Sequence, residues 1–116
     1  MTPITTPIAV TIAGSDSGGG AGLQGDLKTF SALGVYGACV VTALTAQNTA
    51  GVTAIHDVPP DFIAAQIDAV FSDLRPGAVK IGMVSRPETI RAIAAGLDRF
   101  RPANVVLDPV MVASSG

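Results

Sequence analysis

The segment Ile12–Phe30 reads IAGSDSGGGAGLQGDLKTF, and it indicates how the chain folds around it. Six of its residues are glycines, and Gly20–Gly25 form the pattern G-x-G-x-x-G of dinucleotide-binding loops. The apolar run Ile8–Ala13 before it predicts a strand, and residues 21–33 predict a helix that ends at Gly34. A glycine-rich loop between a strand and a helix is typical of a ligand-binding βα connection in an α/β fold.

The loop does not fit a P-loop, which requires the spacing G-x-x-x-x-G-K-[ST]. Gly14 and Gly19 have that spacing, but Gly20 and Ala21 stand where lysine and a hydroxyl residue are required. A dinucleotide-binding loop also requires an acidic residue at the end of the next strand, where this chain has Gln47. A nicotinamide-dependent oxidoreductase domain therefore remains only a less favoured alternative.

Strand and helix patterns alternate along the rest of the chain. Four further strands are predicted, at 38–46, 52–58, 78–83 and 104–108. Two further helices are predicted, at 61–73 and from a capping box at Ser85–Glu88 to Pro102. The almost wholly apolar segment 38–46 indicates one strand that is buried on both faces. This order predicts an α/β fold with a mostly parallel sheet and right-handed crossovers.

Asp26 lies on the apolar side of the first predicted helix. At about 100° per residue, with Leu23 at zero, Phe30 falls at about −20° and Asp26 at about −60°. A carboxylate that faces the core is unfavourable unless it is paired, hydrogen-bonded or in a wet cavity. Two interpretations stay open: Asp26 reaches water or a backbone N–H at the margin of the apolar stripe, or it projects into a ligand pocket.

Polar residues or glycines follow each main predicted strand. They are Gly14–Asp16, Gln47–Thr49, Gly82–Met83 and Asp108–Pro109. Ligands of open α/β sheets bind where the carboxyl ends of the strands meet, so these residues are candidates for a binding site. Strand ends are also polar in proteins without such a site, so this pattern alone does not decide between a binding site and ordinary polar strand ends.

Composition argues against several other classes of protein. The 116 residues suffice for one small domain, and 48% of them are hydrophobic but only 4% aromatic, which suits helices packed on a sheet. The net charge of −2 and the lack of a basic cluster indicate no nucleic-acid partner. A single cysteine, the lack of a targeting segment and the lack of an apolar run of about 18 residues favour a cytoplasmic protein without a membrane partner.

Four blocks occur in order along the chain: TIAGSDSGGGAGLQGDLKTFSALGVYG, TALTAQNTAGV, KIGM and NVVLDPVM. Together they resemble hydroxymethylpyrimidine/phosphomethylpyrimidine kinase, the thiamine-biosynthesis enzyme of the ribokinase-like superfamily. The resemblance implies a three-layer ribokinase-like fold with helices on both faces of the sheet. Residues 1–116 would form about the first half of that fold, as the N-terminal part of a single kinase domain. The resemblance also implies ATP and Mg²⁺ as cofactors and a homodimer of the complete protein.

The resemblance assigns roles to single residues. It places five of them around a pyrimidine substrate: Gly14, Asp26, Gln47, Met83 and Val110. Asp108 matches a family aspartate of the phosphate and metal region, and Lys80 also matches, with a structural ion pair as our preferred interpretation. No catalytic residue or metal-binding motif is expected in this chain, because the family's anion-hole loop and its cysteine belong to the second half of the fold. Cys39 is expected to be an inert core thiol, and His56 a surface or packing residue.

The predicted function is the ATP-dependent phosphorylation of 4-amino-5-hydroxymethyl-2-methylpyrimidine and of its monophosphate in thiamine biosynthesis. A pyridoxal or pyridoxine kinase of the same superfamily is the first alternative, and a non-catalytic fragment is another. We expect Asp26 and Gln47 to face one cavity beside the Gly14–Gly20 loop. We also expect residues 1–116 alone to be inactive and to expose an apolar patch where the second half of the fold would pack.

Overall fold

A computed structural model describes residues 6–84 and 86–108 of the chain. The elements follow one another in the order β1 (Ile8–Ala13), α1 (Gly22–Ala32), β2 (Tyr36–Val41), β3 (Ala43–Asn48), β4 (Gly51–Asp57), α2 (Pro60–Leu74), β5 (Ala78–Ile81), α3 (Pro87–Phe100) and β6 (Asn104–Leu107). The alternation of strands and helices predicted from the sequence is confirmed, with helix boundaries that differ by one or two residues.

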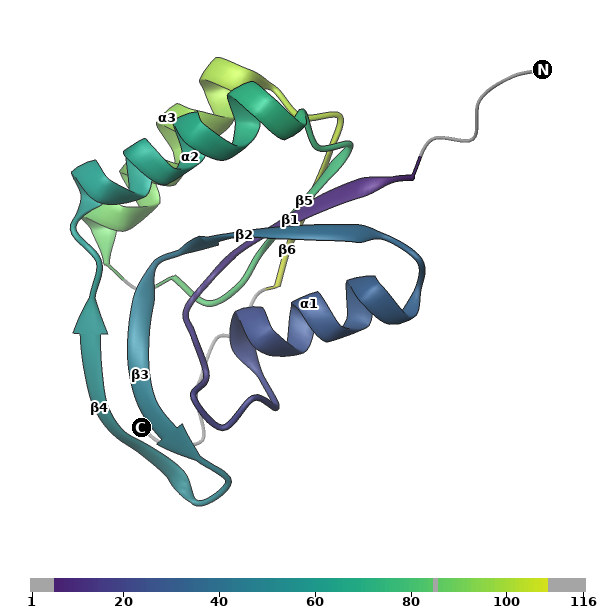
Figure 1. The fold of residues 1–116 in the computed structure, drawn as a ribbon. Coiled ribbons are helices and arrows are strands. Elements are labelled where there is room, and N and C mark those ends of the chain that lie inside the picture. The colour runs from purple at the N-terminus through teal and green to yellow at the C-terminus, as the bar shows by residue number, and fades with distance from the viewer. Residues whose placement is uncertain (1–5, 85, 109–116) are drawn as a thin grey trace.

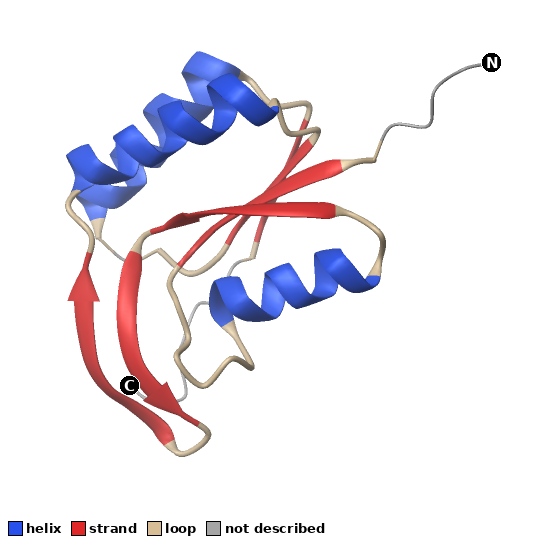
Figure 2. Cartoon of the chain, viewed as in Figure 1, coloured by secondary structure: helices blue, strands red, loops and turns tan. Residues whose placement is uncertain are grey.

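The main sheet has four strands in the order β2-β1-β5-β6, and all of its pairings are parallel. Helix α1 covers one face of this sheet, while α2 and α3 lie together over the other face (Figure 1). The colouring by secondary structure shows the same three layers, with the β3–β4 hairpin extending beyond the sheet (Figure 2). The predicted α/β fold with helices on both faces is therefore confirmed.

The two faces of the sheet differ in chemistry. Side chains alternate along a strand, so β1 and β5 present one set of residues to each helical layer. The layer toward α2 and α3 is apolar and forms the core, with these buried members: Val10, Ile12, Val40, Ile63, Ile67, Phe71, Val79, Ile81 and Ile93. The opposite face, toward α1, carries Thr11 and Lys80, which are register partners on neighbouring strands. The two polar side chains of β1 and β5, Thr11 and Lys80, thus lie on the α1 face.

The prediction of one strand over residues 38–46 is wrong. Strand β2 ends at Val41, and β3 pairs with β4 in a separate antiparallel two-stranded sheet. Thr42 marks the change of direction, because its N–H donates to Ala13 at the end of β1 and its carbonyl accepts from Val58. Beyond Ala13 the neighbouring chain turns away into the glycine loop, so no partner strand continues there. Burial on both faces is also wrong, since β2 is an edge strand in which only Val40 is buried.

The predicted capping box at the start of α3 is also wrong, because the helix begins one residue later than the box requires. The helix begins at Pro87, and Arg86 occupies the N-cap position without a side-chain capping bond. The first helical hydrogen bond runs from the Ile90 N–H to the Arg86 carbonyl, at 3.0 Å. Ser85, the expected cap, lies outside the described residues.

Strand β6 forms the other edge of the sheet and is exposed along its whole length. Val105, Val106 and Leu107 are 46%, 60% and 63% exposed, so both faces of this strand present apolar side chains. Within residues 6–84 and 86–108, no helix is both long and apolar enough to cross a bilayer.

Candidate functional site

One carboxylate organises the glycine loop between β1 and α1. Asp16 is only 6% exposed, and its two oxygens accept three backbone N–H bonds, from Gly18 at 2.8 Å, Gly20 at 3.0 Å and Ala21 at 2.7 Å. The bond from the Ala21 N–H is the main cause that lowers the pKa of Asp16, and burial opposes it. Gln24 completes the arrangement, because its side-chain oxygen accepts the N–H of Asp16 at 2.7 Å.

This arrangement answers which ligand the loop can bind. Backbone N–H groups at a helix N-terminus are the usual cradle of a phosphate. Here the N–H groups of Gly18, Gly20 and Ala21 are already bonded to the carboxylate of Asp16. A phosphate at the same place would have to displace an internal anion, so the loop fits neither a P-loop nor a dinucleotide-binding loop.

The sequence analysis listed Asp16 only among the residues that follow the first strand, and it missed that this carboxylate binds the N–H groups of the loop. A signal was available, because an Asp just before a run of glycines is typical of a turn in which the carboxylate binds backbone N–H groups two residues further on.

Gly14 lies at a close crossing of two backbone segments. The N–H of Leu23 donates to the Gly14 carbonyl at 2.9 Å, so the start of α1 is tied to the end of β1. Gly22 stands at this crossing with φ +58°, and a Cβ added there would lie 2.5 Å from the Gly14 oxygen. Only glycine fits this position, and the contact fixes where the Gly14 peptide points.

The β3–β4 hairpin docks onto the glycine loop and brings Gln47 to it. The Ser15 N–H donates to the Ala43 carbonyl at 2.9 Å, at the start of β3. Ser17 Oγ donates to the Gln47 carbonyl and accepts the Gln47 N–H, both at 2.6 Å. The half-buried Gln47 side chain accepts a bond from Thr45 Oγ1 at 3.1 Å through its Oε1. Gln47 therefore reaches the loop through the hairpin, and not as the end of a strand of the main sheet as expected.

Asp26 points from α1 to the polar face of the sheet. Its Oδ2 accepts the Thr11 hydroxyl at 2.6 Å and the Lys80 ammonium at 2.9 Å, and its Oδ1 accepts the same ammonium at 3.1 Å. The sequence left open whether this carboxylate reaches water, a backbone group or a pocket, and the structure shows that it has two side-chain partners. Lys80 forms the ion pair that was its preferred interpretation.

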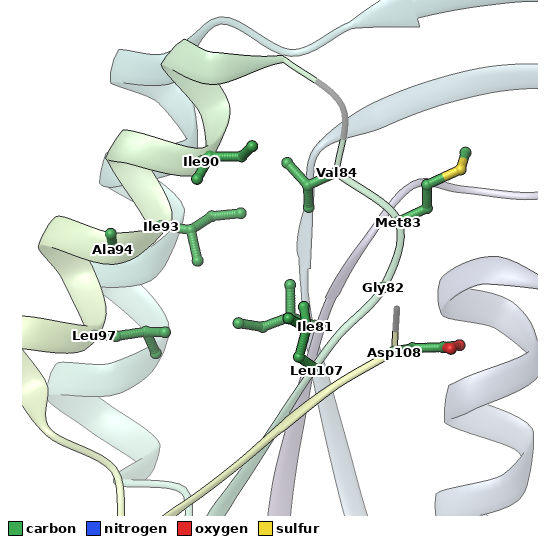
Figure 3. Close-up of a pocket in the computed structure, with 10 residues that line it drawn as sticks. All are labelled: Ile81, Gly82, Met83, Val84, Ile90, Ile93, Ala94, Leu97, Leu107 and Asp108. Atoms are coloured by element: carbon green, nitrogen blue, oxygen red, sulfur yellow. The ribbon is translucent and has the colours of Figure 1, made fainter. Parts of the chain in front are cut away.

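Met83 and Asp108 lie at the carboxyl edge of β5 and β6, beside a cavity of about 370 Å³. Aliphatic residues of α3, β5 and β6 make up most of its lining, among them Ile81, Ile93 and Leu97. Figure 3 shows the Met83 and Asp108 side chains pointing away from α3, while Ile93 and Leu97 point into the cavity. The cavity is therefore an apolar groove under α3, and the two candidate residues project from its rim.

The predicted common cavity for Asp26 and Gln47 stays a prediction. Neither residue lines the groove under α3. Each of them is connected to the β1–α1 segment, Asp26 through Thr11 and Gln47 through Ser17.

The remaining candidates are quickly placed. Val110 lies outside the described residues. Cys39 is half-buried in β2 and is not among the buried core residues, so its expected core position is wrong. Burial raises the pKa of its thiol. His56 is exposed on β4, so its interpretation as a surface residue is confirmed. Across the described part of the chain, no three His, Cys, Asp or Glu residues are grouped so that they could hold a metal ion.

Comparison with known proteins gives consistent matches over most of the chain. A family model described as phosphomethylpyrimidine kinase matches residues 16–116. The hydroxymethylpyrimidine/phosphomethylpyrimidine kinase of Rhizobium meliloti is 72% identical over 111 residues, which cover 96% of this chain and 41% of the relative. This chain thus spans about two fifths of the length of that relative.

Solved structures match in the same way. The crystal structure of phosphomethylpyrimidine kinase from Clostridium difficile superposes with a TM-score of 0.91 at 57% identity, over 96% of this chain and 48% of that one. A pyridoxal kinase from Bacillus subtilis superposes with a TM-score of 0.83 at 37% identity, over 92% of this chain and 42% of that one. The match to the family model covers most of the chain, and the four sequence blocks and the three-layer fold agree with it. The chain belongs to the phosphomethylpyrimidine kinase family.

Proposed function

We propose that the protein containing this chain transfers the γ-phosphoryl group of ATP to 4-amino-5-hydroxymethyl-2-methylpyrimidine and then to its monophosphate, in thiamine biosynthesis. In this proposal the present chain supplies the pyrimidine-binding half. The observation that carries this proposal is that Asp16 binds the N–H groups of the glycine loop. Because these N–H groups are occupied, the loop is unsuited to the phosphates of ATP and is available to the acceptor substrate. Family membership supplies the reaction class.

The candidate residues have the chemistry that a small aminopyrimidine needs. The tight crossing at Gly14 allows backbone to approach a ring closely. Asp26 offers acceptor oxygens for the N–H groups of the amino substituent, and the Gln47 amide offers both a donor and an acceptor. Met83, which is 56% exposed at the strand edge, offers an apolar surface to the ring, as does Val110 in this proposal.

ATP and Mg²⁺ are part of the same proposal, with Asp108 directed toward the phosphates. Asp108 is exposed just beyond β6, and its N–H donates to the Ile81 carbonyl at 2.9 Å, which fixes its backbone at the carboxyl edge. Mg²⁺ in kinases is commonly held by one or two carboxylates plus the substrate phosphates, so one carboxylate here fits that donor set. The ion would neutralise phosphate charge during transfer.

A pyridoxal kinase is the second candidate, because pyridoxal kinases share this fold with TM-scores such as 0.83. Sequence identity favours the pyrimidine, at 57% against 37% for these two solved structures. We further propose that the complete protein is a cytoplasmic homodimer. The β3–β4 hairpin supports the dimer, since this two-stranded sheet exposes an apolar side chain on each face, Leu44 at 49% and Ile55 at 65%.

The test uses a chimaera in which this chain is joined to the remainder of the Rhizobium meliloti relative beyond the matched segment. We expect the chimaera to phosphorylate the hydroxymethylpyrimidine and its monophosphate with ATP and Mg²⁺, with a lower kcat/KM for pyridoxal. This chain alone should show no turnover. A folded chimaera that prefers pyridoxal would favour the second candidate, and one that phosphorylates neither compound would contradict the proposal.

A further inference from the structure

Three residues form a polar cluster between α1 and the sheet, and we call Thr11, Asp26 and Lys80 the Asp26 clamp. Thr11 and Lys80 are register partners on β1 and β5, so their side chains leave neighbouring strands on the same face. Thr11 is fully buried, while the Lys80 and Asp26 side chains are 25% and 20% exposed. The clamp is therefore enclosed at Thr11 and partly open to solvent at Asp26 and Lys80.

The two carboxylate oxygens of Asp26 accept different numbers of hydrogen bonds within the clamp. Oδ2 accepts two bonds, from the Thr11 hydroxyl at 2.6 Å and from the Lys80 ammonium at 2.9 Å. Oδ1 accepts one bond from the same ammonium, at 3.1 Å. A carboxylate oxygen accepts about two hydrogen bonds, so Oδ2 is saturated by the described residues and Oδ1 keeps one acceptor position.

The clamp lies next to the carboxyl edge of the sheet. A Cβ added to Gly82 would lie 3.5 Å from the Lys80 ammonium and 3.0 Å from the Ala13 Cβ. The absence of a side chain at Gly82 therefore leaves room for the ammonium beside the end of β1. Gly14 and Met83, two candidates for the pyrimidine site, are the next residues along these two strands.

We propose that Lys80 is a positioning residue of the pyrimidine site, which together with Thr11 holds Asp26 so that Oδ1 accepts an N–H of the amino group on the substrate ring. This inference rests on the proposed function, because it takes Asp26 as a contact of the pyrimidine. A paired carboxylate accepts hydrogen bonds and donates none, so the clamp selects a ring that presents an N–H at this point. Without Lys80 the half-buried carboxylate loses the cation that compensates its burial, and its orientation is no longer fixed.

A purely structural ion pair predicts a different result. Such a pair would contribute to the free energy of unfolding and would affect both substrates alike once the protein is folded. A positioning role instead predicts that loss of Lys80 raises the KM for the pyrimidine and leaves the KM for ATP unchanged. Steady-state kinetics with each substrate varied in turn separate these two roles.

The test is carried out in the chimaera, whose wild-type form is assayed first with the hydroxymethylpyrimidine. For Lys80→Met we expect the KM for the pyrimidine to rise by about tenfold or more, the loss typical of a bond to a charged group, with the KM for ATP within about twofold. Lys80→Arg should recover part of this loss, because a guanidinium can bond both carboxylate oxygens. Arg99→Met is the matched control, since it breaks an exposed ion pair with Asp68 and should change neither KM.

Thr11→Val tests the same inference if Lys80→Met does not fold, because it removes one hydrogen bond to Oδ2 at nearly constant shape. It should raise the KM for the pyrimidine by a smaller factor than Lys80→Met and leave that for ATP unchanged. An unchanged KM for the pyrimidine, or equal changes for both substrates, would overturn the inference while the proposed function stands. An inactive wild-type chimaera would overturn both.

Discussion

Gly22→Ala should destabilise the protein far more than Gly34→Ala, although both glycines have positive φ, +58° and +75°. A non-glycine residue in the left-handed region lowers the free energy of unfolding by about 1–2 kcal/mol. Alanine also restricts the unfolded chain more than glycine does, which raises the free energy of unfolding by about 0.4–1 kcal/mol. At Gly34, where an added Cβ meets nothing within 4 Å, the net loss is therefore about 1 kcal/mol.

At Gly22 the same Cβ would also lie 2.5 Å from the Gly14 carbonyl oxygen. This oxygen is held in place by the Leu23 N–H, so the backbone itself must shift. Forced overpacking typically adds about 1–3 kcal/mol, which brings the total loss for Gly22→Ala to about 2–4 kcal/mol. Since the shift moves Gly14, the KM for the pyrimidine should also rise in this variant and stay constant in Gly34→Ala.

The assay is urea unfolding of the chimaera, with the free energy of unfolding of both variants extrapolated to water and compared with the wild type. Steady-state kinetics on the same samples give the KM for the pyrimidine. Equal losses of stability in the two variants would refute the close crossing at Gly14, and an unchanged KM in a destabilised Gly22→Ala would refute its link to the site.

Three further predictions concern the site, the loop and the helical layer of the chimaera. Gln47→Leu should weaken pyrimidine binding by about 1–3 kcal/mol and leave ATP binding unchanged, and equal losses for both would show that Gln47 supports only the fold. Because hydrogen bonds lower the pKa of Asp16 below 3.8, the stability that its carboxylate provides is fully present above that pH and is lost as the pH falls through the folded pKa. The stability gap between wild type and Asp16→Asn should therefore narrow on acidification in thermal unfolding, and parallel curves would contradict this. Gly96→Ala would place a Cβ 2.8 Å from Ile67 Cγ2 and 3.0 Å from Ile67 Cδ1, so we expect a net loss of about 1 kcal/mol in urea unfolding. Ile67→Val removes Cδ1 and with it one of these two contacts, so it should cost less in that background than in the wild type.

Local patterns were sufficient for most of the fold. The extent of β1 follows from an apolar run that ends before Gly14, and the end of α1 follows from Gly34. These signals lie within a few residues of the elements that they determine. The helical position of Asp26 correctly placed its side chain on the face toward the sheet, since 3.6 residues per turn fix that face before any packing occurs.

The division of residues 38–46 into β2 and β3 could not be read from the sequence. Its apolar residues are compatible with one long strand, and the break at Thr42 arises because β1 ends at Ala13 and offers no partner beyond it. A strand ends where its neighbour ends, and the neighbour of β2 is β1, which is distant in the sequence. The first contacts after the break are equally distant, since Thr45 and Ser15, which are hydrogen-bonded there, are 30 residues apart.

The sequence by itself determined the family, the βα order and the residue types available for a pyrimidine site, because these depend on motifs and on short-range periodicity. Only the tertiary structure decided which partners those residues take. The Asp16 carboxylate accepts the N–H groups of the glycine loop. Lys80 forms an ion pair with Asp26, although the two residues are 54 residues apart in the chain. Both outcomes depend on the distance between side chains from separate elements, which the sheet register and the packing of α1 set and which no local pattern contains.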